Sequence, residues 1–187
     1  MSLDLEVKRT ALVLIDLEHG IVSRPQLAPY SGPEVVERCR RMAEVVRAKG
    51  GTVIYVHVLL DQIQRLRVDQ QTMPASPPPP HASDLVPEAG MQTGDLVIAK
   101  RQRGAFYGTD LELQLRRREI KTLIMAGIAT NIGVESTARE AFDRGYELVF
   151  AADAMTTMSS EMQDFALTKI FPMMGRVRTT DQIAAEF

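Results

Sequence analysis

Two charged residues stand at the ends of apolar runs, where a parallel α/β protein places its reactive groups. Asp16 directly follows the apolar run 11–15, and Lys100 ends the run 96–100. The carboxyl ends of parallel strands open onto the crevice that binds ligands, so both side chains are predicted to enter one site. There Asp16 can act as an acid or a base, and Lys100 can hold an anion or change the pKa of Asp16. A buried salt bridge that only fixes the strand order is the alternative.

A third candidate lies in the turn 128–133, between the apolar run 122–127 and a helical pattern. The N–H groups in the first turn of a helix have no acceptor within the helix, so they can donate to an oxyanion or a carboxylate. Gly133 lies in this turn. We expect it either to belong to the reactive site or only to let the helix pack close to the strand.

The elements that must position these residues alternate along the chain. Short apolar runs separate amphipathic helical patterns, which is typical of a parallel sheet covered by helices on both faces. We therefore expect an α/β fold with three α/β/α layers, Rossmann-like. The expected strands lie near residues 10–16, 52–58, 96–100, 122–127, 147–151 and 176–178. The expected helices span residues 33–49, 109–117, 131–144, 159–171 and 180–186.

The helix expected at 33–49 carries the only cysteine of the chain. Val35, Cys39, Met42 and Val46 recur at helical spacing, which indicates a face directed toward the core. Cys39 is therefore predicted to be a buried apolar residue and not a nucleophile.

Length and composition exclude several classes of function. A chain of 187 residues with 45% hydrophobic and 25% charged residues fits one domain over residues 1–187. Its net charge of -2 gives no electrostatic reason to expect a nucleic acid or an anionic membrane as partner. A single cysteine excludes an internal disulfide, and the N-terminus lacks the pattern of a signal peptide, so a cytoplasmic location is expected.

The alternation stops between residues 60 and 94. This stretch includes the proline-rich sequence MPASPPPPHASDLVPEAG, which favours an extended backbone. An insertion of this length forms either a cover over the active site or a plain surface loop. Both interpretations remain open.

Three segments together resemble one family of enzymes. ALVLIDLEHG, LVIAKRQRGAFYGTDL and TLIMAGIATNIGVESTAREAF resemble, in their order and context, the isochorismatase-like superfamily of cysteine hydrolases, and the resemblance extends over residues 11–183. It implies a six-stranded, mainly parallel sheet with strand order 3-2-1-4-5-6. It also implies a cis peptide between Ile128 and Ala129, and an oxyanion hole formed by the N–H groups of Ala129 and Gly133.

The same resemblance assigns the site residues. The implied catalytic positions are Asp16, Lys100 and Gly133, and the implied substrate-binding positions are Phe106, Ala129, Thr130 and Asn131. Most members carry a nucleophilic cysteine where this chain has Gly133, whereas the isochorismatases proper also have glycine there.

Three functions are compatible with this pattern. The first is a hydrolase of a small carboxylated molecule, with Asp16 as the acid in a vinyl-ether cleavage. The second is an amide or ester hydrolase that uses a water molecule activated by Asp16. The third is a catalytically inactive protein that binds a small ligand or a partner protein through the pocket that serves as the active site in related enzymes.

No cofactor is expected. His19, His57 and His81 do not match the spacing by which the nicotinamidase branch holds a metal, and no G-x-G-x-x-G or P-loop follows the first strand. The expected partner is a small-molecule substrate, with no nucleic acid and no membrane, and the resemblance implies a homodimer or a larger homo-oligomer.

Overall fold

A parallel sheet forms the centre of the computed structural model, which describes residues 3–72 and 76–187. Within these ranges the sheet has six strands in the order β3-β2-β1-β4-β5-β6, and each neighbouring pair is parallel. The strands are β1 Thr10–Ile15, β2 Thr52–Val58, β3 Leu96–Lys100, β4 Thr122–Ile128, β5 Glu147–Thr156 and β6 Gly175–Arg178. The strand order that the sequence resemblance implied is confirmed.

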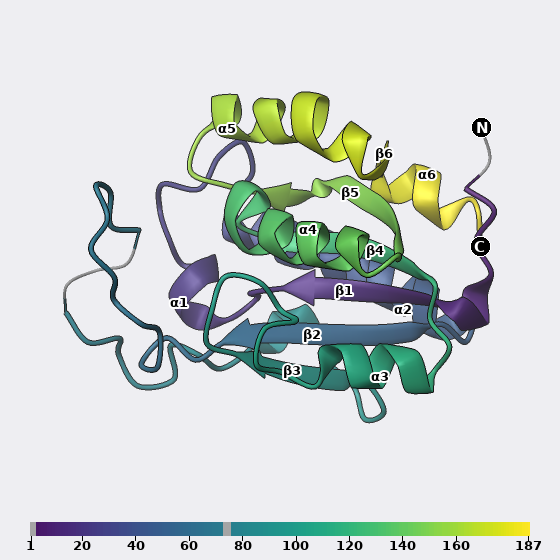
Figure 1. Cartoon of the computed structure of the whole chain (residues 1–187), viewed down its shortest axis with the longest axis horizontal. Helices are drawn as coiled ribbons and strands as arrows, with labels where there is room; N and C mark the ends of the chain where they lie inside the picture. Colours follow the sequence, from purple (N-terminus) through teal and green to yellow (C-terminus); the bar gives the residue numbers. More distant parts are fainter. Residues whose placement is uncertain (1–2, 73–75) are drawn as a thin grey trace.

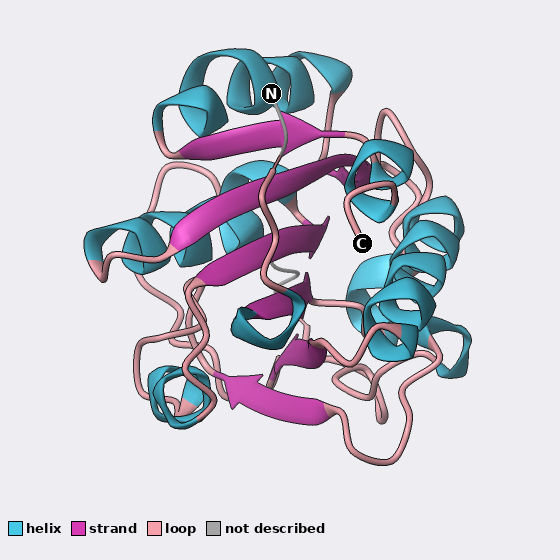
Figure 2. Cartoon of the chain, turned by 90° about the vertical axis from the view of Figure 1, so that its right-hand side faces the viewer, coloured by secondary structure: helices cyan, strands magenta, loops and turns pink. Residues whose placement is uncertain are grey.

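Helices cover both faces of the sheet (Figure 2). The α-helices are α1 His19–Val22, α2 Gly32–Ala48, α3 Leu111–Arg117, α4 Glu135–Asp143, α5 Ser160–Phe165 and α6 Thr180–Ala184. In Figure 1, α3 and α4 lie in front of the sheet and α2 lies behind it. Short 3-10 turns are η1 Val7–Arg9, η2 Pro87–Ala89 and η5 Phe171–Met173, and π-helical turns are η3 Thr130–Val134 and η4 Ala166–Ile170.

The core consists of two apolar clusters, one on each face of the sheet. In β1, Leu12 and Leu14 belong to the cluster with α2, whereas Val13 and Ile15 belong to the opposite one. All six residues of β1 are buried, because a central parallel strand has no solvent face. Cys39 lies in the α2 cluster with no exposed surface, as its helical spacing predicted.

Two elements differ most from their expected bounds, while the others shift by a few residues at their ends. β5 continues to Thr156, past the expected end at residue 151, because a register shift opposite Met125 and Gly127 inserts extra residues before pairing resumes. The helix expected at 159–171 is α-helical only in α5 and continues as η4 and η5, where Pro172 cannot donate to the helical ladder.

The loop between β2 and β3 lies at the end of the sheet toward which the strand arrows point (Figure 1). Its described parts, residues 59–72 and 76–95, contain the short turn η2. A bridge between Leu85 and Glu18 joins the loop to the segment after β1. Residues 73–75, which fall in the proline-rich stretch, lie outside the described residues.

Candidate active site

Asp16 and Lys100 meet at the carboxyl edge of the sheet. Asp16 leaves β1 with a positive φ of 55° and its N–H donates to the carbonyl of Val56 at 2.7 Å. Lys100 is the last residue of β3, and its Nζ lies 2.9 Å from Oδ2 of Asp16. The same Nζ donates to the carbonyl of Arg103 at 2.8 Å. The strand order brings the two side chains together across β2, as their places at the strand ends predicted.

This ion pair is almost fully removed from solvent. The side chains of Lys100 and Asp16 are 1% and 9% exposed. Burial raises the pKa of the Asp16 carboxyl above its ordinary value, and the charge and hydrogen bond of Lys100 offset only part of that rise. The charges of His57 and Arg24 also favour the ionised form. Asp16 is therefore a carboxyl whose environment favours the protonated form more than water does.

Gly133 lies against this pair. A Cβ atom built on Gly133 would stand 2.9 Å from Oδ2 of Asp16, 3.1 Å from Cγ2 of Ile15 and 3.2 Å from Nζ of Lys100. Any side chain at 133 would therefore press on the ion pair. Glycine keeps the space beside the ion pair open, so it affects the site as well as the packing of the helix.

The turn before Gly133 is fixed by its own hydrogen bonds. The Ile128–Ala129 peptide is cis, as the sequence resemblance implied, and the N–H groups of Ile132 and Val134 both donate to the carbonyl of Ala129, at 3.0 and 3.2 Å. Thr130 begins the π-helical turn η3 and is completely buried. These hydrogen bonds fix the backbone of the turn 128–133, which is called the elbow below, at the end of β4.

Side chains from the following segments hold the same turn. The hydroxyl of Thr130 donates to Oε1 of Gln163 at 2.5 Å, and Oδ1 of Asn131 accepts from the hydroxyl of Thr157 at 2.5 Å. Nε2 of Gln163 in turn donates to the carbonyl of Met155 at 3.2 Å. In this structure, Thr130 and Asn131 use these polar groups to position the elbow.

A cavity of about 730 Å³ opens above the ion pair. Asp16, Lys100, Ala129 and Gly133 line it, so it contains four of the seven predicted site residues. Residues 63–66, 68, 71 and 72 of the long loop form much of its wall. The described part of the loop therefore lines the cavity above the ion pair, which is where a cover over an active site would lie.

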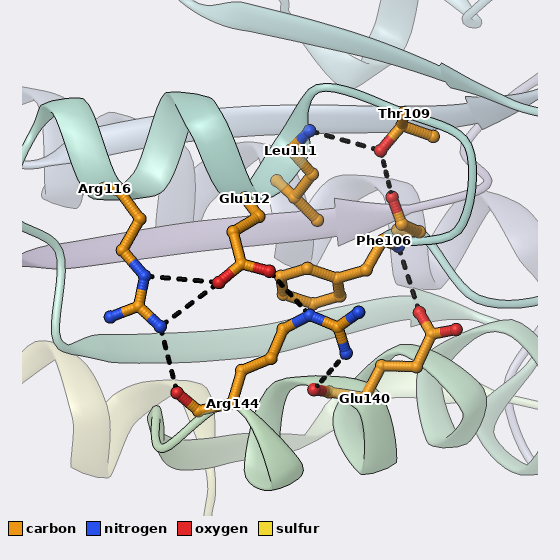
Figure 3. A network of polar contacts seen from close by, with 8 residues as sticks. Phe106, Thr109, Leu111, Glu112, Arg116, Glu140 and Arg144 are labelled. Atoms are coloured by element: carbon orange, nitrogen blue, oxygen red, sulfur yellow. Dashed lines mark hydrogen bonds and ion pairs between the residues drawn. The ribbon is translucent and has the colours of Figure 1, made fainter.

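Phe106, in the turn between β3 and α3, is not among the described residues that line the cavity. Its ring is 5% exposed, stands 6.0 Å from the ring of Tyr146 and lies 4.7 Å below the guanidinium of Arg144. Its N–H donates to the carboxylate of Glu140 at 3.0 Å, and Arg144 donates to Glu112 at 2.7 Å (Figure 3). The described cavity lining takes Tyr107 from this turn, not Phe106. The expected pocket position of Phe106 is thus corrected: its ring anchors the turn against α3 and α4.

Comparison with known proteins agrees with this geometry. The model of the isochorismatase domain matches residues 10–182. The chain belongs to the isochorismatase family. The isochorismatase family protein YwoC of Bacillus subtilis (strain 168) is 44% identical over 185 residues, which cover 97% of this chain and 95% of the relative. The structure of an isochorismatase family protein from Burkholderia thailandensis superposes with a TM-score of 0.89 at 44% identity, covering 96% of this chain and 95% of the other.

A more distant relative carries an assigned activity. The ureidoacrylate amidohydrolase RutB of Stutzerimonas stutzeri (strain A1501) is 28% identical over 213 residues, which cover 99% of this chain and 85% of the relative. The protein is a hydrolase of the isochorismatase family. Among its described residues, no helix is long and apolar enough to cross a membrane, and no group of three or more His, Cys, Asp or Glu side chains could hold a metal ion.

Two residues of this isochorismatase-family site escaped the sequence analysis. Glu18 is completely buried, and Arg24 lines the cavity beside Asp16. Burial lowers the pKa of Arg24, while the charges of Glu18 and Asp16 oppose that shift. The signal for Glu18 was a second acidic residue two positions after Asp16 at the end of a buried strand. Arg24 carried no comparable signal, because it follows the four-residue helix α1, which has no clear pattern of its own.

Proposed function

We propose that the protein hydrolyses a small carboxylated molecule without a cysteine nucleophile, with Asp16 as the acid. The observation that carries the proposal is the buried Asp16–Lys100 pair, which lines a cavity beside Gly133. Because burial raises the pKa of Asp16, its carboxyl is suited to hold a proton for delivery. Gly133 supplies no nucleophile, so we assign the attack to a water molecule.

Vinyl-ether cleavage is a reaction of this kind. Asp16 would protonate the terminal enol carbon, so that a C–H bond forms and the ether oxygen stabilises the resulting oxocarbenium ion. Water then adds to the cationic carbon and releases a proton. The hemiketal collapses to pyruvate and an alcohol, with no covalent bond to the protein at any stage.

The charge of the cavity favours a carboxylated substrate. Of the described lining residues, Arg24, Arg65, Lys100 and Arg103 are cationic and Asp16 and Glu140 are acidic. Lys100 already donates to Asp16 and to a backbone carbonyl, so its role is to set the proton affinity of Asp16. We assign the substrate carboxylate to a guanidinium of this lining, because a guanidinium presents a planar pair of donors that matches a carboxylate. Arg24 lines the cavity while it also donates to the carbonyls of Gly20 and Thr72, at 3.2 and 3.5 Å.

Pyruvate release from isochorismate, followed by a coupled dehydrogenase assay, tests the proposal. We expect release by the native protein and loss of it in Asp16→Asn, which keeps the shape of the side chain but cannot give a carboxyl proton. Asp110→Asn, the same change at an exposed residue before α3, is the matched control and should keep full activity. Turnover by Asp16→Asn would refute the acid role, and no pyruvate from the native protein would exclude isochorismate.

Amide or ester hydrolysis is the second candidate, and the likeness to a ureidoacrylate amidohydrolase favours it. In this case Asp16 would activate water, and the N–H groups of Ala129 and Gly133 would hold the oxyanion. Gly133→Cys would then place a thiol beside Asp16 and trap an acyl adduct, visible as added mass on the protein. A broad panel of amides that leaves no adduct would contradict this candidate.

A further inference from the structure

Glu18 is a buried carboxyl group that the proposed reaction does not yet use. It lies two residues after Asp16 and has no exposed surface. Its backbone is fixed by the bridge to Leu85, and its carbonyl accepts from the N–H groups of Ile21 and Val22 at 3.0 and 2.9 Å. The backbone at Glu18 is therefore fixed, and the side chain starts from a defined place two residues after Asp16.

The side chain of Glu18 has few polar partners. Oε1 accepts one bond, from the N–H of Val58 at 3.3 Å. Among residues 3–72 and 76–187, Oε2 of Glu18 has no hydrogen-bond partner, and the same holds for Oδ1 of Asp16. No ion pair of the described chain includes Glu18. A buried carboxylate with so few hydrogen-bond donors around it lowers the stability of the fold. A protonated carboxyl avoids the buried charge, and its O–H group can donate to a neighbouring oxygen.

The surrounding charges keep the proton on this group. Among the described residues, the charges that act with Glu18 are those of Asp16 at the end of β1, Lys100 at the end of β3 and Arg24 after α1, and His57 in β2 acts on Asp16. Burial and the negative charge of Asp16 raise the pKa of Glu18 well above its usual range, and the Val58 N–H and Lys100 offset this only in part. Lys100 bonds to Oδ2 of Asp16, so of the two carboxyls it stabilises the ionised form of Asp16 more directly.

We propose that Glu18 is the proton-holding partner of Asp16: the two carboxyl groups keep one proton between them at neutral pH, and it rests on Glu18 until Asp16 needs it. In the reaction, the O–H bond of Glu18 breaks as one forms on Asp16, and Asp16 passes that proton to the substrate carbon. Water that adds to the cationic intermediate loses a proton, which returns to the pair. One proton enters the substrate and one leaves it in each cycle, so no outside acid is required.

The delivery step rests on the proposed function, whereas the shared proton does not. Carbon-13 NMR of protein labelled at the glutamate side-chain carboxyl carbons tests the shared proton without any substrate. Glu18→Gln assigns the signal, because it removes one resonance while keeping an acceptor for the Val58 N–H. Glu34→Gln, at an exposed glutamate of the α2 capping box, is the control and should leave the Glu18 resonance unchanged.

We expect the Glu18 resonance to remain at its protonated position at pH 7. In Asp16→Asn, which removes the negative charge that acts on Glu18, its transition should move to lower pH by about one unit or more. A Glu18 resonance already at the carboxylate position at pH 7 would overturn the proposal, as would a transition that Asp16→Asn leaves unchanged. Failure to release pyruvate would exclude isochorismate as the substrate and would not alter either NMR result.

Thermal unfolding gives a second readout that does not depend on Asp16→Asn. A folded pKa raised above the ordinary value of 4.5 stabilises the fold below that pH and loses this effect as pH rises toward the folded pKa. Glu18→Gln lacks this loss, so its melting temperature should rise relative to the native protein as pH increases from 4.5 to 8. A difference that stays constant over this range would contradict a protonated Glu18.

Discussion

Because Asp16 and Lys100 form a buried ion pair, we expect the effects of Asp16→Asn and Lys100→Met on the free energy of unfolding to be strongly coupled. At 2.9 Å and an effective dielectric constant of about 20, the two charges attract by about 6 kcal/mol, and this attraction is offset by the cost of their desolvation. Removing one partner leaves the other charge buried, which costs about 3–5 kcal/mol of unfolding free energy. Asp16→Asn should show this loss, because the Lys100 ammonium then retains only the carbonyl of Arg103.

Lys100→Met should behave differently, because Asp16 can respond by taking a proton. Without Lys100 the pKa of Asp16 rises further above its ordinary value of 3.8. A raised folded pKa gives stability that is present below the unfolded pKa and is lost as pH rises through the folded value. The cost of Lys100→Met should therefore be larger at pH 8 than at pH 5.

Urea unfolding of both single variants and of the double variant measures the coupling. We expect the double variant to be less destabilised than the sum of the single variants by about 2–3 kcal/mol, because neither charge remains buried. Arg139→Met is the control, because it breaks a surface ion pair with Glu135. The side chain of Arg139 is 53% exposed and that of Glu135 is 19% exposed, so the substitution should cost at most about 1 kcal/mol of unfolding free energy. Additivity within about 0.5 kcal/mol would refute the view that the pair acts as one buried unit.

Three further changes test the surroundings of the site. Gly133→Ala would press a methyl group on Asp16 and Lys100, so turnover should fall by about tenfold or more while the melting temperature changes little; full activity would contradict the role of the open space. Gln163→Leu removes the bonds to Thr130 and Met155 and should cost about 2–4 kcal/mol in urea unfolding. Gln114→Leu, at a half-buried glutamine that bonds to Asp110 and Arg118 near its own helix, should cost less. Burial raises the pKa of the Cys39 thiol, so a disulfide reagent should label Cys39 only after unfolding, and rapid labelling of the native protein would show that the thiol is accessible.

The sequence predicted the parts of the site that depend on strand ends. Asp16 and Lys100 could be found because each follows a run of apolar residues, and parallel strands bring their carboxyl ends to one edge. The helical spacing around Cys39 was sufficient to predict its burial, because an apolar face of a helix packs against the core. Each of these local patterns is compatible with only one position in the fold.

The remaining features depend on contacts between distant segments. Phe106 follows Lys100 closely, yet its direction is set by Arg144 and Tyr146, which lie about forty residues later in the chain. The extension of β5 depends on an irregular register with β4. Glu18 reads as an ordinary acidic residue after a strand, and only the fold shows that no solvent reaches it.

The loop between β2 and β3 affects how the cavity can change in evolution. The groups assigned to the proposed reaction come from strand ends and from the turn 128–133, whereas residues 63–66, 68, 71 and 72 of the loop form much of the cavity wall. Most of those loop side chains are exposed and make few core contacts, so substitutions there carry a small cost in stability. Substrate preference can therefore diverge between relatives while the chemistry below it stays the same.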